Sequence, residues 1–134
     1  MLTAKGKYSL KALGHLATLE PGATAQAIDI AATNNIPKKF LDAILGELRN
    51  AGIVYSRKGP GGGYMLARAP SQIKIGHVIR TVDGPLAPFE DAESLRRRVQ
   101  TDEKHRPLFR LLLEVRDATA RILDHTSVAD LCKQ

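Results

Sequence analysis

The chain of 134 residues carries 20 Lys and Arg against 14 Asp and Glu, a formal net charge of +6, and 43% of its residues are hydrophobic. This length fits one domain, or one domain with an extension, and it allows a real hydrophobic core. The longest stretch without a charged residue, Gly59 to Ala67, has nine residues. Because a membrane-spanning helix needs about 20 apolar residues, we expect no transmembrane segment and a cytoplasmic protein.

The positive charge is unevenly distributed along the chain. Residues 1–84 hold 11 Lys and Arg against five Asp and Glu, whereas residues 85–134 hold nine of each. A basic segment of this kind is typical of polyanion binding, most often to duplex nucleic acid, although a merely solvated basic face has the same composition. Three Phe, three Tyr and no Trp argue against single-stranded nucleic acid as the main partner.

Three helices are predicted in the first 50 residues. Apolar residues recur at helical spacing from Lys7 to Leu19. Thr24 is a candidate N-cap for a second helix, and Asn34-Asn35 supplies a tight turn after it. Pro37 suits the first turn of a third helix, whose predicted apolar stripe consists of Phe40, Leu41, Ile44, Leu45 and Leu48.

The second and third helices form a candidate helix-turn-helix. They are separated by about four residues, a spacing typical of that motif. Lys38 and Lys39 lie in the first turn of the third helix. An ordinary helical hairpin is the alternative interpretation of the same pattern.

A β-hairpin with a basic, glycine-rich tip is predicted next. Segments 53–56 and 63–67 are prone to form strands, and Arg57-Lys58-Gly59-Pro60-Gly61-Gly62 lies between them. Glycine-rich loops that bind nucleotides open a helix at the phosphate, whereas this loop leads into a strand. The pattern therefore predicts the wing of a winged helix rather than a nucleotide site.

The rest of the chain is predicted to contain a short helix, a connector and a long helix. A fourth helix is expected over 75–82, and Asp83-Gly84-Pro85 ends it. Residues 85–106 lack sustained periodicity, and we interpret them as a connector with a short helical turn at 92–99. The long helix begins at Pro107 and reaches about His125, and Thr126 or Ser127 caps a last turn at 128–131.

The long helix is apolar over more than one face. Phe109, Leu113 and Leu123 lie off its main stripe. Such a helix has more to bury than one neighbour can cover, which indicates a partner chain, although packing on the first helix of the same chain is the alternative. The predicted dimerisation stripe consists of Leu108, Leu111, Leu112, Val115, Thr119 and Ile122.

A set of short motifs covers nearly the whole chain. It comprises Leu2-Thr3, Lys5-Gly6-Lys7-Tyr8, Phe40-Leu41-Asp42, the wing at 57–67, Val82-Asp83-Gly84, 115–118 and 126–131. The combination closely resembles the Rrf-two (Rrf-II) family of bacterial winged-helix transcription regulators. The resemblance implies a mainly α-helical fold with a small β-hairpin: a winged helix-turn-helix domain at 1–84, a connector at 85–106, and a dimerisation helix with a C-terminal turn at 107–134.

The resemblance also implies a function. It predicts a sequence-specific DNA-binding transcriptional regulator, expected to be a repressor and not an enzyme. The homodimer would place two third helices in successive major grooves, and two wings in minor grooves, of a near-palindromic operator of double-stranded DNA. Carried over by position, the DNA-contacting residues are Lys5, Tyr8, Pro37, Lys38, Lys39, Asp42, Ser56, Arg57, Lys58, Gly59 and Pro60. Lysines at a helix start neutralise phosphates.

Many family members hold an iron–sulfur cluster on three connector cysteines, and residues 85–106 of this chain contain none. The one cysteine, Cys132, lies near the C-terminus, and the four histidines have no zinc-site spacing. We therefore expect no cofactor and no metal. Two functions stay open: a regulator that answers to a small ligand or to its own concentration, or an interaction module whose DNA binding is controlled by complex formation with a metabolic enzyme, as in one repressor of this family.

Overall fold

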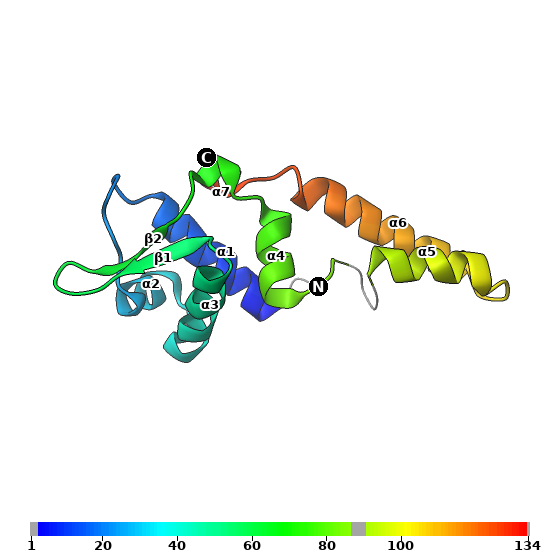
Figure 1. Cartoon of the computed structure of the whole chain (residues 1–134), viewed down its shortest axis with the longest axis horizontal. Helices are drawn as coiled ribbons and strands as arrows, with labels where there is room; N and C mark the ends of the chain where they lie inside the picture. The colour runs from blue at the N-terminus through cyan, green and yellow to red at the C-terminus, as the bar shows by residue number, and fades with distance from the viewer. Residues whose placement is uncertain (1–2, 87–90, 134) are drawn as a thin grey trace.

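The structure is a computed structural model that describes residues 3–86 and 91–133, so Leu2 of the N-terminal motif and residues 87–90 of the predicted connector lie outside the described residues. Its elements are α1 (Ala4–Ala17), α2 (Ala27–Asn34), α3 (Lys38–Asn50), β1 (Val54–Arg57), β2 (Gly63–Leu66), a 3-10 turn (Pro70–Gln72), α4 (Ile75–Asp83), α5 (Ala92–Thr101), α6 (Arg106–Leu123) and α7 (Val128–Leu131). The mainly helical fold with one hairpin is as predicted. The hairpin and the α5–α6 pair lie at opposite ends of the molecule (Figure 1).

One hydrophobic core joins α1 to α2, α3 and α4. Residues of α3 at steps of three and four are fully buried in it, namely Leu41, Ile44, Leu45 and Leu48. Each such side chain contributes about 1.5–3 kcal/mol to folding. Phe40 was predicted in this stripe, but it is 55% exposed. It precedes Leu41 by one residue, which turns it about 100° away from the buried face.

The ends of α2 and α3 differ by a residue or two from the predictions. Gln26, not Thr24, is the N-cap of α2. The hydroxyl of Thr24 instead donates to the carbonyl of Gly61 in the wing, at 2.8 Å. Asn35 ends α2 in the left-handed conformation, with a φ of 53°, so the predicted turn is confirmed. Pro37 is the N-cap of α3 rather than part of its first turn.

The hairpin is anchored to the segment that precedes α2 through Tyr64, near the loop end of β2. Strands β1 and β2 pair antiparallel from Val54↔Leu66 to Arg57↔Gly63. Ala25 and Tyr64 exchange two backbone hydrogen bonds, of 3.0 and 2.7 Å. A Cβ at Gly63 would lie 2.6 Å from the Ala25 carbonyl oxygen, and the φ of Gly63 is +146°. This close approach requires glycine.

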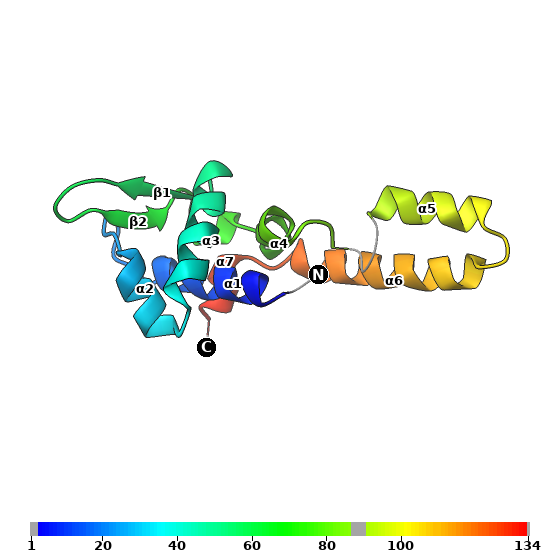
Figure 2. The ribbon, with the colours of Figure 1, turned by 90° about the horizontal axis from the view of Figure 1, so that it is seen from below.

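The predicted connector contains a full helix instead of a short turn. Helix α5 packs antiparallel along α6 (Figure 2). Asp91 caps it, because its Oδ1 accepts a hydrogen bond from the Ser94 backbone N–H at 2.8 Å. Leu95 is fully buried, and Arg106 Nε donates to the Val99 carbonyl at 2.7 Å. The periodicity was weak because Leu95 is the one residue of α5 that is fully buried.

Helix α6 carries an exposed apolar stripe. The predicted members Leu108, Leu111, Val115 and Ile122 are 39–61% exposed, whereas Leu112 and Thr119 are half-buried. Phe109, which lies off the stripe, packs under the Arg98 guanidinium, whose Cζ is 5.4 Å from the ring centroid. Within the described ranges, no helix is long and apolar enough to cross a membrane.

The last turn, α7, returns the chain to the winged-helix part. Ser127 caps it in a reciprocal capping box with Asp130, so Ser127 is the cap among the two residues predicted. The Val128 N–H donates to the Ile73 carbonyl at 2.9 Å, and α7 packs on α1.

Candidate nucleic-acid interface

The start of α3 presents two exposed lysines. Lys38 Nζ lies 3.1 Å from Asp42 Oδ2, one turn further along the helix, and both side chains are more than half exposed. Lys39 is also exposed. A surface pair of this kind contributes at most about 1 kcal/mol, so a phosphate or a base edge can replace either partner at small cost. The predicted contacts Lys38, Lys39 and Asp42 are therefore accessible together.

Lys5 is placed differently from the other predicted contacts. Its Nζ lies 2.6 Å from Glu47 Oε1, which ties α1 to α3. The second carboxylate oxygen of Glu47 is buried and has no hydrogen-bond partner among the described residues. Lys5 thus supports the position of α3, and its predicted contact with the DNA backbone stays a prediction.

Two aromatic rings meet beside the start of α3. The ring centroids of Tyr8 and Phe40 are 6.2 Å apart, with planes tilted by 41°. Tyr8 is half-buried, whereas Phe40 is exposed. Sequence reasoning assigned Phe40 to the core and so missed it as a surface residue. Its place in the first turn of α3, at the edge of the buried face, is the signal that could have identified it.

The wing tip exposes Lys58, Gly59 and Pro60, while Ser56 is half-buried in β1. Arg57 is directed to the loop that precedes α2, because its Nη2 donates to the Gly22 carbonyl at 3.4 Å. The same nitrogen contacts the sulfur of Met65 at 3.8 Å. The cation at the tip itself is therefore Lys58. The wing and α3 lie together at the end of the molecule remote from α5 and α6 (Figure 1).

The residues do not fit a thiolate-held iron–sulfur cluster. Cys132 is the sole cysteine; it is exposed at the C-cap of α7, and its Sγ lies 3.9 Å from the Gly14 carbonyl oxygen. Among residues 3–86 and 91–133, no three His, Cys, Asp or Glu side chains are grouped as metal ligands. Cluster ligation takes several thiolates, or histidines in place of some of them, and this chain offers one thiol.

The fold and the basic end define a winged-helix transcriptional regulator. Residues 2–134 match the family described as "Rrf2: Iron-dependent Transcriptional regulator", and the chain belongs to the Rrf2 family, whose relatives here are regulators rather than enzymes. The HTH-type transcriptional regulator CymR of Bacillus subtilis is 34% identical over 133 residues, 97% of this chain and 88% of CymR.

Solved structures agree with this assignment. The structure of CymR, the global cysteine regulator of B. subtilis, has a TM-score of 0.81 at 34% identity, over 98% of this chain and 95% of the CymR chain. IscR of T. potens has a TM-score of 0.72 at 28% identity, over 98% of this chain and 85% of IscR. The predicted family and fold are confirmed.

Proposed function

We propose that the chain is a sequence-specific DNA-binding regulator that acts as a homodimer on a near-palindromic operator and represses transcription. The observation that carries this proposal is the joint exposure of the α3 start and the wing tip at one end of the fold. Lys38 and Lys39 stand where the helix end is itself electropositive, and Lys58 extends the basic surface along the hairpin.

In this proposal few side chains contact the edges of the bases. Asp42 lies on the exposed face of α3, one turn from Lys38, where its carboxylate would accept a hydrogen bond from a cytosine amino group. The glycines of the wing have no Cβ and so allow its backbone to approach the sugar–phosphate wall closely. Tyr8 would support the helix start through Phe40.

The exposed stripe of α6 supports the homodimer. Leu108, Leu111, Val115 and Ile122 follow one another at steps of three, four and seven, and all are exposed in the single chain. A second copy related by a two-fold axis would cover this stripe with the same stripe. Under this proposal residues 1–84 contact DNA and 107–134 form the dimer, and α5 within 85–106 supports α6.

The test is fluorescence anisotropy on the duplex upstream of the chain's own coding region, with a shuffled duplex of equal length as control. We expect affinity at least about a thousandfold higher for the upstream duplex, as is usual for specific sites. Equal affinity for the two duplexes at physiological salt contradicts sequence-specific binding at that site.

A second control mechanism is complex formation with a metabolic enzyme. The observation that favours it is a groove of about 720 Å³ between α1, α2 and α7, lined in part by Leu10, Leu131 and Cys132. Leu131 is 48% exposed there. A regulator of this kind changes its operator affinity on addition of the partner enzyme and not of metabolites alone.

The same proposal includes no iron–sulfur cofactor. It is supported by the single thiol of the chain and by the position of that thiol on α7, away from the connector. Regulation would then depend on another signal.

A further inference from the structure

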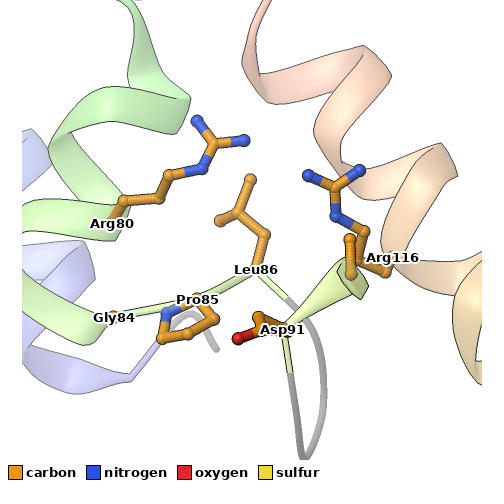
Figure 3. A pocket seen from close by; sticks show the side chains of 7 residues that line it. Arg80, Gly84, Pro85, Leu86, Asp91 and Arg116 are labelled. Carbon is orange, nitrogen blue, oxygen red and sulfur yellow. The ribbon is translucent and has the colours of Figure 1, made fainter. Parts of the chain in front are cut away.

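A cavity of about 340 Å³ lies where α4, α5 and α6 meet. Figure 3 shows the guanidinium groups of Arg80 and Arg116 projecting from two different helices into the same space above Leu86, with Asp91 on the opposite side. Gly84, Pro85, Leu86 and Ala92 supply the rest of the lining. Two cationic groups and one anionic group thus face an apolar floor.

The two guanidinium groups keep donors for a ligand. Arg80 uses Nη1 and Nη2 to bind Asp124, at 2.6 and 2.8 Å. Arg116 uses Nη1 to bind Asp117, at 3.0 Å. A guanidinium carries five N–H donors in a planar fork, so these contacts of the described residues leave several donors on each group. Carboxylates suit such donors because they accept two hydrogen bonds in one plane.

Asp91 gives the opposite end of the cavity a negative charge. Its Oδ1 accepts the Ser94 N–H that caps α5, and no ion pair joins its carboxylate to a cation among the described residues. Each arginine is already paired with an acid, Asp124 or Asp117, so Asp91 disfavours a simple anion and attracts an ammonium, while the unused N–H donors of the arginines suit a carboxylate. A small molecule that carries both charges satisfies both ends.

We propose that this cavity binds a small zwitterion of the α-amino acid class, with its carboxylate toward Arg80 and Arg116 and its ammonium toward Asp91. The side chain of the ligand would lie over Leu86 and Pro85. This inference rests on the proposed function, because it makes the cavity the effector site of the regulator. The cavity joins α4 of the DNA-binding part to α6 of the dimer, so an occupant changes the preferred angle between them and hence operator affinity.

The test begins with ligand binding in the absence of DNA. The full chain is titrated by calorimetry with the proteinogenic amino acids one at a time. Propionate and ethylamine serve as single-charge analogues of alanine. We expect saturable binding of at least one amino acid, and no binding of either analogue at the same concentrations. The absence of binding by every amino acid overturns the proposal, and so does propionate binding as tight as that of the best amino acid.

Two variants and a matched control locate the site. Arg116→Gln removes a charged donor, and Asp91→Asn removes the charge but keeps an oxygen that can cap α5. Each variant is expected to bind the tightest-binding amino acid with about ten- to hundredfold lower affinity, the usual effect of losing a charged hydrogen bond. Arg110→Gln, on α6 but outside this cavity, is the control and is expected to bind the same amino acid with the affinity of the parent chain. Unchanged affinity in both cavity variants overturns the proposal.

Measurements of operator binding distinguish a failure of this inference from a failure of the proposed function. Operator affinity of the unliganded chain is measured on the same preparation, then repeated with the amino acid at saturation, for the parent chain and for Asp91→Asn. A shift of at least about fivefold in the parent, absent in Asp91→Asn, is expected of an allosteric ligand. Operator binding with no amino acid binding refutes only the cavity proposal. Amino acid binding without any operator preference refutes the DNA-binding proposal on which the effector role depends.

Discussion

Arg80 and Asp124 form a two-pronged ion pair that fastens α4 to the end of α6. Nη1 and Nη2 of Arg80 donate to Oδ1 and Oδ2 of Asp124, at 2.6 and 2.8 Å. The hydrogen bonds from Arg80 lower the pKa of Asp124 below its ordinary value of 3.8, against a smaller opposing effect of burial. The same contact raises the pKa of Arg80. The pair therefore connects the two parts of the chain electrostatically.

Replacing Asp124 with Asn is expected to flatten the acid dependence of stability. Because the pKa of Asp124 is lower in the folded than in the unfolded chain, the pair stabilises the fold above pH 3.8, and this contribution is lost as the pH falls through the lower folded pKa. Both side chains are more than a third exposed, so solvent screening limits the effect to about 0.5–1 kcal/mol.

Urea midpoints at fixed chain concentration, measured from neutral pH down to about pH 3, check this prediction. The parent chain is expected to lose more stability than Asp124→Asn over the acid part of the range. Parallel curves for the two chains contradict it.

Gly76→Ala is expected to destabilise the same junction. A Cβ at Gly76 would overlap Asp124 Oδ1 and lie 2.9 Å from Arg80 Nη1, so the pair must move to make room. The matched control is Gly14→Ala in α1, where a Cβ meets nothing within 4 Å and the gain in helix propensity is about 1 kcal/mol. At Gly76 the disturbed pair costs about 0.5–1 kcal/mol and offsets the gain in helix propensity, so the melting temperature should rise for Gly14→Ala and should not rise for Gly76→Ala. Equal melting temperatures for the two variants contradict the prediction that a Cβ at Gly76 displaces the ion pair.

Lys38, Lys39 and Lys58 are expected to carry phosphate contacts. Each lost contact should reduce the slope of log affinity against log salt by about 0.9, so Lys39→Ala is titrated against operator at several salt concentrations. Lys104→Ala, at the exposed turn between α5 and α6, is the control and should keep the parent slope. An unchanged slope removes Lys39 from the phosphate contacts, and undiminished affinity in the triple variant refutes this interface.

Asp in place of Leu111 or Ile122 is expected to give a folded monomer. Both side chains are more than half exposed in the single chain, so the charge disrupts the interface without entering the core. Each buried apolar side chain lost from the interface removes about 1.5–3 kcal/mol before ordering costs. Light scattering should show monomers with normal circular dichroism and weak operator binding.

Gln100→Asp on the exposed face of α5 is the charge-matched control for the dimer and should remain dimeric. A parent chain that is monomeric at micromolar concentration contradicts the dimer itself.

The purified chain is expected to lack an iron–sulfur cluster under anaerobic handling. Cys132 is its one thiol, and even two copies supply only two thiolates. The spectrum should lack the visible thiolate-to-iron charge-transfer bands, and operator affinity should not depend on oxygen. Anaerobic reconstitution that yields a stable brown dimer with altered DNA affinity contradicts this expectation.

Local signals in the sequence predicted much of the fold. The wing follows from strand-prone segments on either side of a glycine-rich loop, and the stripe of α3 from apolar residues at helical steps. Thr126 and Ser127 are both candidate caps in the sequence, and the structure shows that Ser127 is the cap, in a capping box with Asp130 three residues later. Each of these signals depends on residues close together in the chain.

The remainder depends on distant contacts. Lys5 and Glu47 are 42 residues apart, and no local pattern indicates that this lysine pairs with α3. Helix α5 was underestimated because a two-helix pair needs only a narrow contact, centred on Leu95. The cavity between Arg80 and Arg116 arises where three helices meet, so neither arginine marks a site in the sequence.

The two backbone hydrogen bonds between Ala25 and Tyr64 fix the separation between the wing and the helix-turn-helix. Main-chain pairing of this kind leaves little room for the hairpin to swing independently, and the Thr24 hydroxyl holds the wing loop at Gly61 as well. Within one protomer these bonds therefore hold the wing at a defined span from the helix-turn-helix. Under the proposed function, a half-site whose minor groove is out of phase with that span would have to twist or bend to be bound, and base steps that are never touched would then contribute to selectivity through their stiffness.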